Sequence, residues 1–162
     1  MVRVESESRF LGGAGNVASN IVALGGDATI IGVTGRDAFA DNLSDLFGSS
    51  GIRALLIRLN RPTTVKTRIL ARRQQMLRLD HECTEPLTSD ERTGLIQTIR
   101  AEAAQYQVII LSDYGKGLFG DAFMADFNSV IRSLPHSPSI LVDPKPQHFP
   151  YYADSTLLTP NL

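Results

Sequence analysis

The chain has 162 residues, 43% of them apolar, and a formal net charge of −1 at pH 7. This composition is typical of one globular domain with its own core, and it excludes a disordered chain and a strongly basic nucleic-acid-binding protein. A single cysteine excludes an internal disulfide, and no apolar run approaches the roughly 18 residues of a membrane-spanning helix. The polar first ten residues lack the apolar segment of a secretory signal, so we expect a cytoplasmic protein with neither a nucleic-acid nor a membrane partner.

Segments with helical and strand patterns alternate along most of the chain. Helical spacing of apolar residues predicts four helices, over residues 15–24, 37–49, 88–104 and 121–134. Short, continuous apolar runs predict four strands buried on both faces, over residues 28–33, 108–111, 140–142 and 156–158. This alternation predicts an α/β fold, in which a doubly wound, mainly parallel sheet carries helices on both faces.

One segment interrupts the alternation. Residues 52–58, 63–71 and 74–81 have strand patterns with no helix between them. In the second of these, apolar and polar residues alternate, which is typical of an antiparallel strand with one face in water. We therefore predict a β ribbon over residues 52–83, joined by residues 1–5, that projects from the body as a lid or an oligomer contact.

Polar residues follow the predicted strands of the sheet. They are Asp37, Asp113, Lys116, Asp143, Lys145 and Asn161. Ligands of open parallel sheets bind at the carboxyl ends of the strands, so these side chains should meet at one rim. Carboxylates accept hydrogen bonds from sugar hydroxyls or hold Mg²⁺ through water, and lysines neutralise phosphate. Each aspartate taken alone also fits a helix cap or a turn.

A glycine-rich stretch, residues 11–16, opens the first predicted helix. Gly13 lets a ligand approach the backbone, and Asn16 offers both a donor and an acceptor to sugar hydroxyls. A loop and cap without a ligand is the alternative. The stretch also fits a form of the dinucleotide fingerprint, but no buried strand directly precedes it, so a nicotinamide or flavin fold is not favoured.

The predicted ribbon is rich in basic residues. They are Lys66, Arg68, Arg72, Arg73 and Arg78. Arginine binds phosphate through two parallel hydrogen bonds, so the ribbon suits a phosphorylated substrate. A solvated face or a charge-protected edge strand is the alternative. Aromatic residues do not alternate with these cations, which argues against nucleic acid. The three histidines and Cys83 show no zinc-binding spacing.

Short motifs occur in order along nearly the whole chain, at residues 12–18, 24–25, 32–37, 63–68, 74–80, 112–117, 142–145 and 158–161. Each is weak alone, but their number and order, and above all the stretch Gln74-Gln-Met-Leu-Arg-Leu-Asp80, make the combination specific. Together they resemble the ribokinase/phosphofructokinase-B family of sugar kinases, and within it the heptose 7-phosphate kinase domains of bacterial ADP-heptose synthases.

The resemblance implies a ribokinase-like fold and transfer of the γ-phosphoryl of ATP, with Mg²⁺, to the C1 hydroxyl of a heptose 7-phosphate. Such catalysis depends on positioning and charge neutralisation. It implies that the sugar binds at Gly13, Asn16, Lys66, Arg68, Arg78, Asp113 and Lys116. It implies that ATP lies toward Asp143, Lys145 and Asn161, without a direct metal ligand among them. It also implies a homodimer that pairs through the ribbon.

Two segments of the family pattern have no counterpart within residues 1–162. One is the opening strand with its substrate-binding acid, and the other is the late Gly-Ala-Gly-Asp segment with the anion hole and catalytic base. We therefore expect a partial kinase domain that lacks the ATP-binding half and has negligible turnover alone. Another sugar or sugar-phosphate kinase of the same family, and a non-catalytic sugar-phosphate binding or dimerisation module, remain alternatives.

Overall fold

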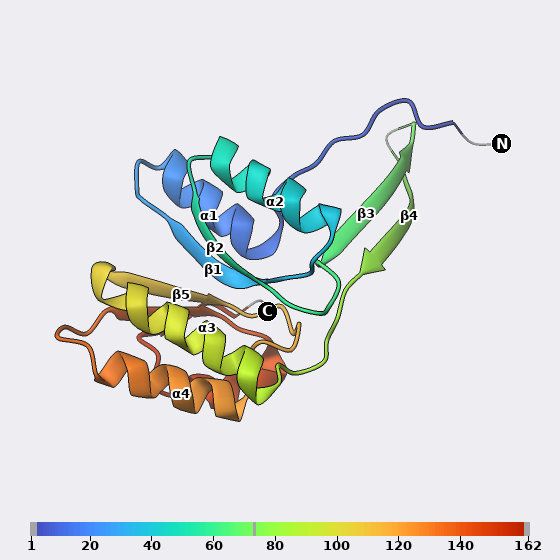
Figure 1. The fold of residues 1–162 in the computed structure, drawn as a ribbon. Coiled ribbons are helices and arrows are strands. Elements are labelled where there is room, and N and C mark those ends of the chain that lie inside the picture. The colour runs from blue at the N-terminus through green and yellow to red at the C-terminus, as the bar shows by residue number, and fades with distance from the viewer. Residues whose placement is uncertain (1–2, 73, 161–162) are drawn as a thin grey trace.

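The protein is described by a computed structural model that covers residues 3–72 and 74–160. Its elements are, in chain order, α1 (Gly13–Ala23), β1 (Thr29–Thr34), α2 (Ala38–Ser49), β2 (Arg53–Arg58), β3 (Val65–Ala71), β4 (Gln74–His81), α3 (Ser89–Glu102), η1 (Ala103–Gln105), β5 (Val108–Ser112), α4 (Asp121–Arg132), β6 (Ser139–Asp143), η2 (Pro146–Tyr152) and β7 (Leu157–Leu158). The four predicted helices are confirmed to within two residues at each end (Figure 1). The short helix η2, which contains two prolines, was not predicted.

β1 and β2 form a parallel ladder that is covered on both faces. Ile30 and Leu56 pack with α1 and α2 in a small core around the buried Phe47. Ile31 and Ile57, which alternate with them, pack into the larger core beneath α3. Alternate residues of one strand point to opposite faces, so this ladder separates two hydrophobic layers. Helices on both faces are thus confirmed for this pair of strands.

A second parallel ladder runs β5–β6–β7, with β6 in the centre. Its core face packs against α3 and α4, where Phe127, Val130 and Val142 are at most 1% exposed. On the opposite face, Val108 and Ile110 of β5 are 46% and 38% exposed. This ladder is therefore covered by helices on one face within the described part of the chain.

The predicted sheet is divided. Over residues 3–72 and 74–160, no strand of the first ladder is hydrogen-bonded to a strand of the second, so one continuous doubly wound sheet is not observed. Side chains join the first ladder to the segment that precedes β5: Arg53 of β2 pairs with Glu102 of α3, and the Tyr106 hydroxyl donates to Thr29 Oγ1 at 2.7 Å. Every buried parallel strand has the same apolar pattern, so the pattern predicts strands but not which ones pair.

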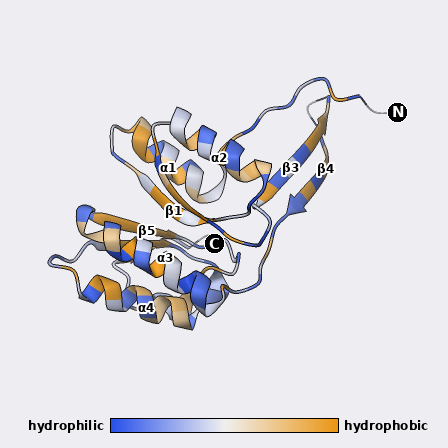
Figure 2. Ribbon diagram, viewed as in Figure 1, coloured by the Kyte–Doolittle hydropathy of each residue, from blue (hydrophilic) through white to orange (hydrophobic). Residues whose placement is uncertain are grey.

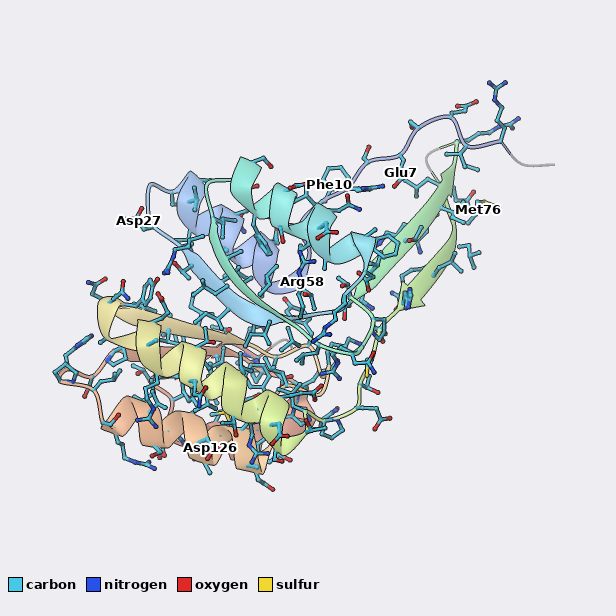
Figure 3. The ribbon with its side chains drawn as sticks, viewed as in Figure 1. Glu7, Phe10, Asp27, Arg58, Met76 and Asp126 are labelled. Atoms are coloured by element: carbon cyan, nitrogen blue, oxygen red, sulfur yellow. The ribbon has the colours of Figure 1, made fainter. Side chains whose placement is uncertain are left out.

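Ion pairs fasten the helices. Arg58, at the end of β2, pairs with Asp41 of α2 at 2.6 Å, and Arg92 of α3 pairs with Asp126 of α4 at 2.9 Å (Figure 3). Thr88 caps α3, because it accepts from the Glu91 amide while Glu91 accepts from the Thr88 amide. Residues 88–91 therefore form a capping box at the start of α3.

The projecting ribbon is confirmed but is shorter than predicted. It consists of β3 and β4, paired antiparallel from Val65–His81 to Ala71–Gln74. It extends away from the helices (Figure 1), and hydrophobic and hydrophilic residues alternate along β3 (Figure 2). Residues 53–58 are not part of it, because β2 pairs with β1 in the body. The run Ala54-Leu-Leu-Ile57 is apolar on both faces, which suits burial between two helical layers rather than an exposed ribbon.

Residues 3–12 form an extended arm with no helix or strand. Residues 3–5, which we predicted to join the ribbon, form no strand, and residues 1 and 2 lie outside the described residues. Residues 3–10 of the arm are exposed, and the Phe10 side chain is 84% exposed (Figure 3), whereas Leu11 packs against the small core around Phe47. In the described chain, no helix has the length and hydrophobicity needed to span a bilayer.

Candidate functional site

The glycine-led start of α1 lies against the loop that follows β5. Gly13 has φ +49°, a left-handed conformation that favours glycine. A Cβ added there would lie 3.1 Å from Cε2 of Tyr114, so the ring rests on the glycine backbone. The Tyr114 hydroxyl donates to Asp143 Oδ2 at 3.3 Å. The predicted meeting of the glycine stretch with the ends of β5 and β6 is therefore observed.

Lys145 completes this part of the rim. It follows β6, and its side chain lies beside Gly115, where an added Cβ would be 3.4 Å from Lys145 Cε. Gly115 and Gly117 both have positive φ, at +64° and +75°, which brings the loop backbone close to its neighbours. Burial and the nearby Asp143 carboxylate raise the pKa of Tyr114, which keeps its hydroxyl protonated as a donor.

Asp113 is enclosed by protein. The residue is 4% exposed, and its carboxylate accepts from Tyr152 Oη at 2.7 Å, His148 Nδ1 at 2.6 Å and the Gly115 amide at 2.8 Å. Burial alone would raise the pKa of Asp113, but these donors outweigh it and hold the pKa below its usual range. Burial and the Asp113 carboxylate raise the pKa of Tyr152. The structure thus places Asp113 beneath the rim loop, not facing outward from it.

A cluster of charges lies where the ribbon meets the body. Glu82 bridges two lysines: Oε1 is 2.6 Å from Lys116 Nζ and Oε2 is 3.0 Å from Lys66 Nζ. Asp80 joins them, at 2.7 Å from Lys66 Nζ and 2.9 Å from Arg78 Nε. The hydrogen bonds that Lys66 donates to Asp80 and Glu82 raise the pKa of Lys66, and the hydrogen bonds that Glu82 accepts from Lys116 and Lys66 lower the pKa of Glu82. We call these five residues the cation cluster.

The cluster brings together cations that are far apart in the sequence. Lys66 comes from β3, Arg78 from β4 and Lys116 from the loop after β5. Arg68 lies opposite Arg78 in the ribbon register, so two like charges face each other and favour an anion nearby. Three cations and two carboxylates leave a formal charge of +1 on the cluster.

Four other residues that we predicted at the site or in the ribbon lie outside the contacts described above. Asn16 is exposed near the start of α1. Asp37 caps α2, accepting from the Ala40 amide at 3.1 Å and from the Thr63 amide at 2.9 Å, so its role as a helix cap is confirmed. Asn161 and Arg73, which we predicted at the rim and in the ribbon, lie outside the described residues.

The sequence did not single out Tyr114, Glu82, His148 and Tyr152. Tyr114 lies inside the motif over residues 112–117, but the motif contains charged residues that indicate a polar site more strongly than a tyrosine does. Glu82 and Lys116 are 34 positions apart, and no periodicity relates them. His148 and Tyr152 lie in η2, whose two prolines hid its helical character. Long-range contacts of this kind have no local pattern to predict them.

The comparisons with known proteins agree over nearly the whole chain. The family model described as "pfkB family carbohydrate kinase" matches residues 1–160. The chain is 41% identical over its full length to "Bifunctional protein HldE" of Pseudomonas paraeruginosa, and covers 33% of that protein. It is 39% identical to "D-beta-D-heptose 7-phosphate kinase" of Bordetella bronchiseptica, with 99% of this chain matching 50% of that protein. The chain therefore spans between a third and a half of the length of these relatives.

Solved structures resemble the fold. The tetrameric inhibited form of phosphofructokinase-2 from Escherichia coli matches 98% of this chain and 55% of its own, with a TM-score of 0.70 and 18% identity. Ribokinase from Giardia lamblia matches 93% of this chain and 48% of its own, with a TM-score of 0.64 and 15% identity. At these identities the likeness concerns the fold alone.

Proposed function

Because the chain belongs to the pfkB family of carbohydrate kinases, we propose that it is the sugar-binding part of an ATP-dependent kinase. We propose D-glycero-D-manno-heptose 7-phosphate as the substrate, phosphorylated at its C1 hydroxyl. Relatives named HldE and D-beta-D-heptose 7-phosphate kinase, near 40% identity, support this choice. The single observation that carries the proposal is the cation cluster, whose Lys116 follows by two residues the Tyr114 ring that lies against Gly13.

The cluster suits the phosphate that the substrate already bears. The two oxygens of the Glu82 carboxylate contact Lys66 and Lys116, one each. Two oxygens of a phosphate group have a similar spacing, so a phosphate could contact the same two lysines. A sugar phosphate would bring its C7 phosphate to these lysines and to the Arg68–Arg78 face of the ribbon. Its hydroxyls would reach the amide of Asn16, which is exposed at the start of α1. Such contacts hold the sugar in one orientation, which is the main contribution a protein makes to phosphoryl transfer.

The ATP site that we propose lies at the carboxyl end of β6. ATP, with Mg²⁺, supplies the γ-phosphoryl group. Lys145 supplies a cation of the kind that neutralises phosphate oxygens, and Asp143, which accepts from Tyr114, supplies a carboxylate that can hold a hydrated metal. Within the described residues, no set of three or more His, Cys, Asp or Glu side chains is placed to hold a metal ion. A sugar phosphate and ATP are cytoplasmic metabolites, so we propose a cytoplasmic location.

The ribbon supports a homodimer. Ile69, Leu77 and Leu79 lie on one face and are 41%, 50% and 52% exposed. A two-stranded ribbon is marginally stable alone, and it needs a partner for its apolar face. We propose that the ribbon of a second copy covers it, which would leave the charged face with Lys66 and Arg78 turned toward the substrate.

Isothermal titration calorimetry of this chain with sugar phosphates tests the proposed substrate without requiring turnover. We expect heptose 7-phosphate to bind at least tenfold more tightly than fructose 6-phosphate or ribose 5-phosphate. Tighter binding of a pentose or hexose phosphate would favour another kinase of the same family. An absence of binding to every sugar phosphate would contradict the proposal. An ADP-release assay on the same samples should show negligible turnover, as expected for the sugar-binding part of a kinase, and turnover like that of a full-length kinase would contradict this expectation.

A further inference from the structure

Glu82 is an acidic residue inside the proposed phosphate site. It follows β4, and its carboxylate lies between two cations from different parts of the fold. Oε2 is 3.0 Å from Lys66 Nζ of the ribbon, and Oε1 is 2.6 Å from Lys116 Nζ of the loop after β5. The side chains of Glu82, Lys66 and Lys116 are 23%, 37% and 27% exposed, so solvent reaches all three. An anion of the chain itself therefore already contacts both lysines that would bind the phosphate.

Asp80, the other acidic residue of the cluster, joins different partners. Its carboxylate contacts Lys66 at 2.7 Å and Arg78 at 2.9 Å, and both of these cations belong to the ribbon. Within the described residues, only Glu82 contacts Lys66 and Lys116 together. The two acidic residues thus carry the same charge, but they differ in whether they fill the space between the two lysines.

The backbone that follows Glu82 is held by contacts that do not involve its carboxylate. Arg61 Nη2 donates to the Glu85 carbonyl at 2.6 Å, and the Leu87 amide donates to the Gly117 carbonyl at 3.2 Å. The Glu82 side chain can therefore rotate into solvent while the segment that carries it keeps its place.

We propose that the Glu82 carboxylate occupies the phosphate position of the empty site and that a phosphate monoester displaces it; this inference rests on the proposed function. A phosphate monoester carries a charge of about −1.5 to −2 near pH 7 and three acceptor oxygens, more than a carboxylate offers. It can replace both ion pairs of Glu82 and remain between Lys66 and Lys116. An unphosphorylated sugar has no charge with which to compete, so it leaves Glu82 in place.

The exchange has a small energetic cost, because ion pairs that solvent reaches contribute little to stability and the released carboxylate regains its water. The ribbon also stays joined to the loop, since the phosphate contacts the same two lysines. Glu82 therefore keeps Lys66 and Lys116 paired when no ligand is bound, and it lowers the affinity of the site for phosphate by competing for them.

Isothermal titration calorimetry with inorganic phosphate and with heptose 7-phosphate tests this competition. Glu82→Gln keeps the size of the side chain and removes its charge. We expect both ligands to bind roughly fivefold more tightly to this variant than to the original chain, because two partly exposed ion pairs no longer have to be broken. A loss of affinity, or no change, would overturn the proposal, because it would mean that Glu82 only positions the lysines.

Two further variants separate competition from a general effect of charge. Asp80→Asn raises the charge of the cluster by the same amount but leaves Glu82 between the lysines, so Glu82→Gln should bind both phosphate ligands several-fold more tightly than Asp80→Asn does. Asp27→Asn removes an exposed carboxylate outside the cluster (Figure 3) and should bind them as the original chain does. Equal affinities in Glu82→Gln and Asp80→Asn would overturn the proposal.

Carbon NMR of the chain labelled at its glutamate carboxyl groups follows the displacement itself. The Glu82 signal, identified by its loss in Glu82→Gln, should move toward the signals of exposed glutamates as heptose 7-phosphate saturates the chain, and it should stay fixed with the unphosphorylated heptose. A Glu82 signal that does not move at saturation would overturn the proposal. A preference of the original chain for another sugar phosphate would contradict the proposed substrate but not this inference, so the two fail separately.

Discussion

Two aspartates that follow strands are held by backbone donors of the protein itself. Asp37 accepts from the Ala40 and Thr63 amides, and Asp113 accepts from the Gly115 amide and two side chains of η2. Each stabilises a loop at the rim and thereby places its neighbours. The residue type and position were predictable from the sequence. The direction of each side chain was not, because it depends on Thr63 and Tyr152, which are remote in the chain.

These two carboxylates make stability sensitive to acid. The Thr63 amide is the main cause that lowers the pKa of Asp37, and for Asp113 the hydrogen bonds outweigh the effect of burial. A lowered pKa stabilises the fold above the unfolded value of about 3.9, and this stability is lost as pH falls through the folded value. The free energy of unfolding in urea should therefore be constant near pH 6 and fall below about pH 4.

Substitution of Asp37 provides the test of this assignment. Asp37→Ala should lower the free energy of unfolding at pH 7 by about 1 kcal/mol, as the loss of a helix cap does, and should weaken the acid dependence. Asp27→Asn removes an exposed carboxylate from the loop before β1 (Figure 3) and serves as the control. Equal acid dependence in Asp37→Ala and the original chain would contradict the account.

Position 117 requires a glycine for two reasons, its left-handed backbone conformation and the lack of room for a side chain. Its φ of +75° disfavours other residues, and an added Cβ would overlap the Glu85 carbonyl. Gly117→Ala should therefore cost about 1–3 kcal/mol of unfolding free energy, measured by urea denaturation. Gly120→Ala is the matched control, because Gly120 has extended backbone and open space around its Cα. A cost no larger than that of the control would show that the loop relaxes freely.

The helices and strands were predictable because their apolar periods are strong. The alternation in β3 is a local pattern, and it predicts the antiparallel strand that is observed. The error at β2 arose from its place in the chain: it stands next to two ribbon strands, although its apolar run is typical of a buried parallel strand. The helix η2 was missed because prolines at 146 and 150 remove the usual helical signal.

The apolar face of the ribbon predicts the behaviour of the protein in solution. Leu77→Glu and Leu79→Glu together should weaken dimerisation at least tenfold in sedimentation equilibrium, because charges would be buried at the proposed contact. Met76→Glu changes a residue that is 64% exposed and has no cross-strand partner in the ribbon register, so it is the control. A monomeric original chain, or equal dissociation constants for all variants, would contradict the ribbon dimer.

Across the whole molecule, the site depends on contacts between segments that are remote in sequence. Gly13 meets Tyr114, Tyr114 meets Asp143, and Glu82 joins the ribbon to Lys116. The strand-end rule predicted that the rim residues gather, because it follows from the polarity of parallel strands. It did not predict the division into two ladders or the carboxylates that neutralise Lys66. Those depend on strand order and on charge pairing across the fold.

The measurement that tests the central claim most directly is the affinity of heptose 7-phosphate for Lys66→Ala and Lys116→Ala, with the unphosphorylated heptose as the second ligand. If both lysines hold the phosphate, each substitution should weaken binding of heptose 7-phosphate at least tenfold and leave binding of the free heptose unchanged. Arg132→Ala, on the remote α4, should bind both ligands as the original chain does. Unchanged affinity for heptose 7-phosphate in both lysine variants would show that the cation cluster is not the phosphate site.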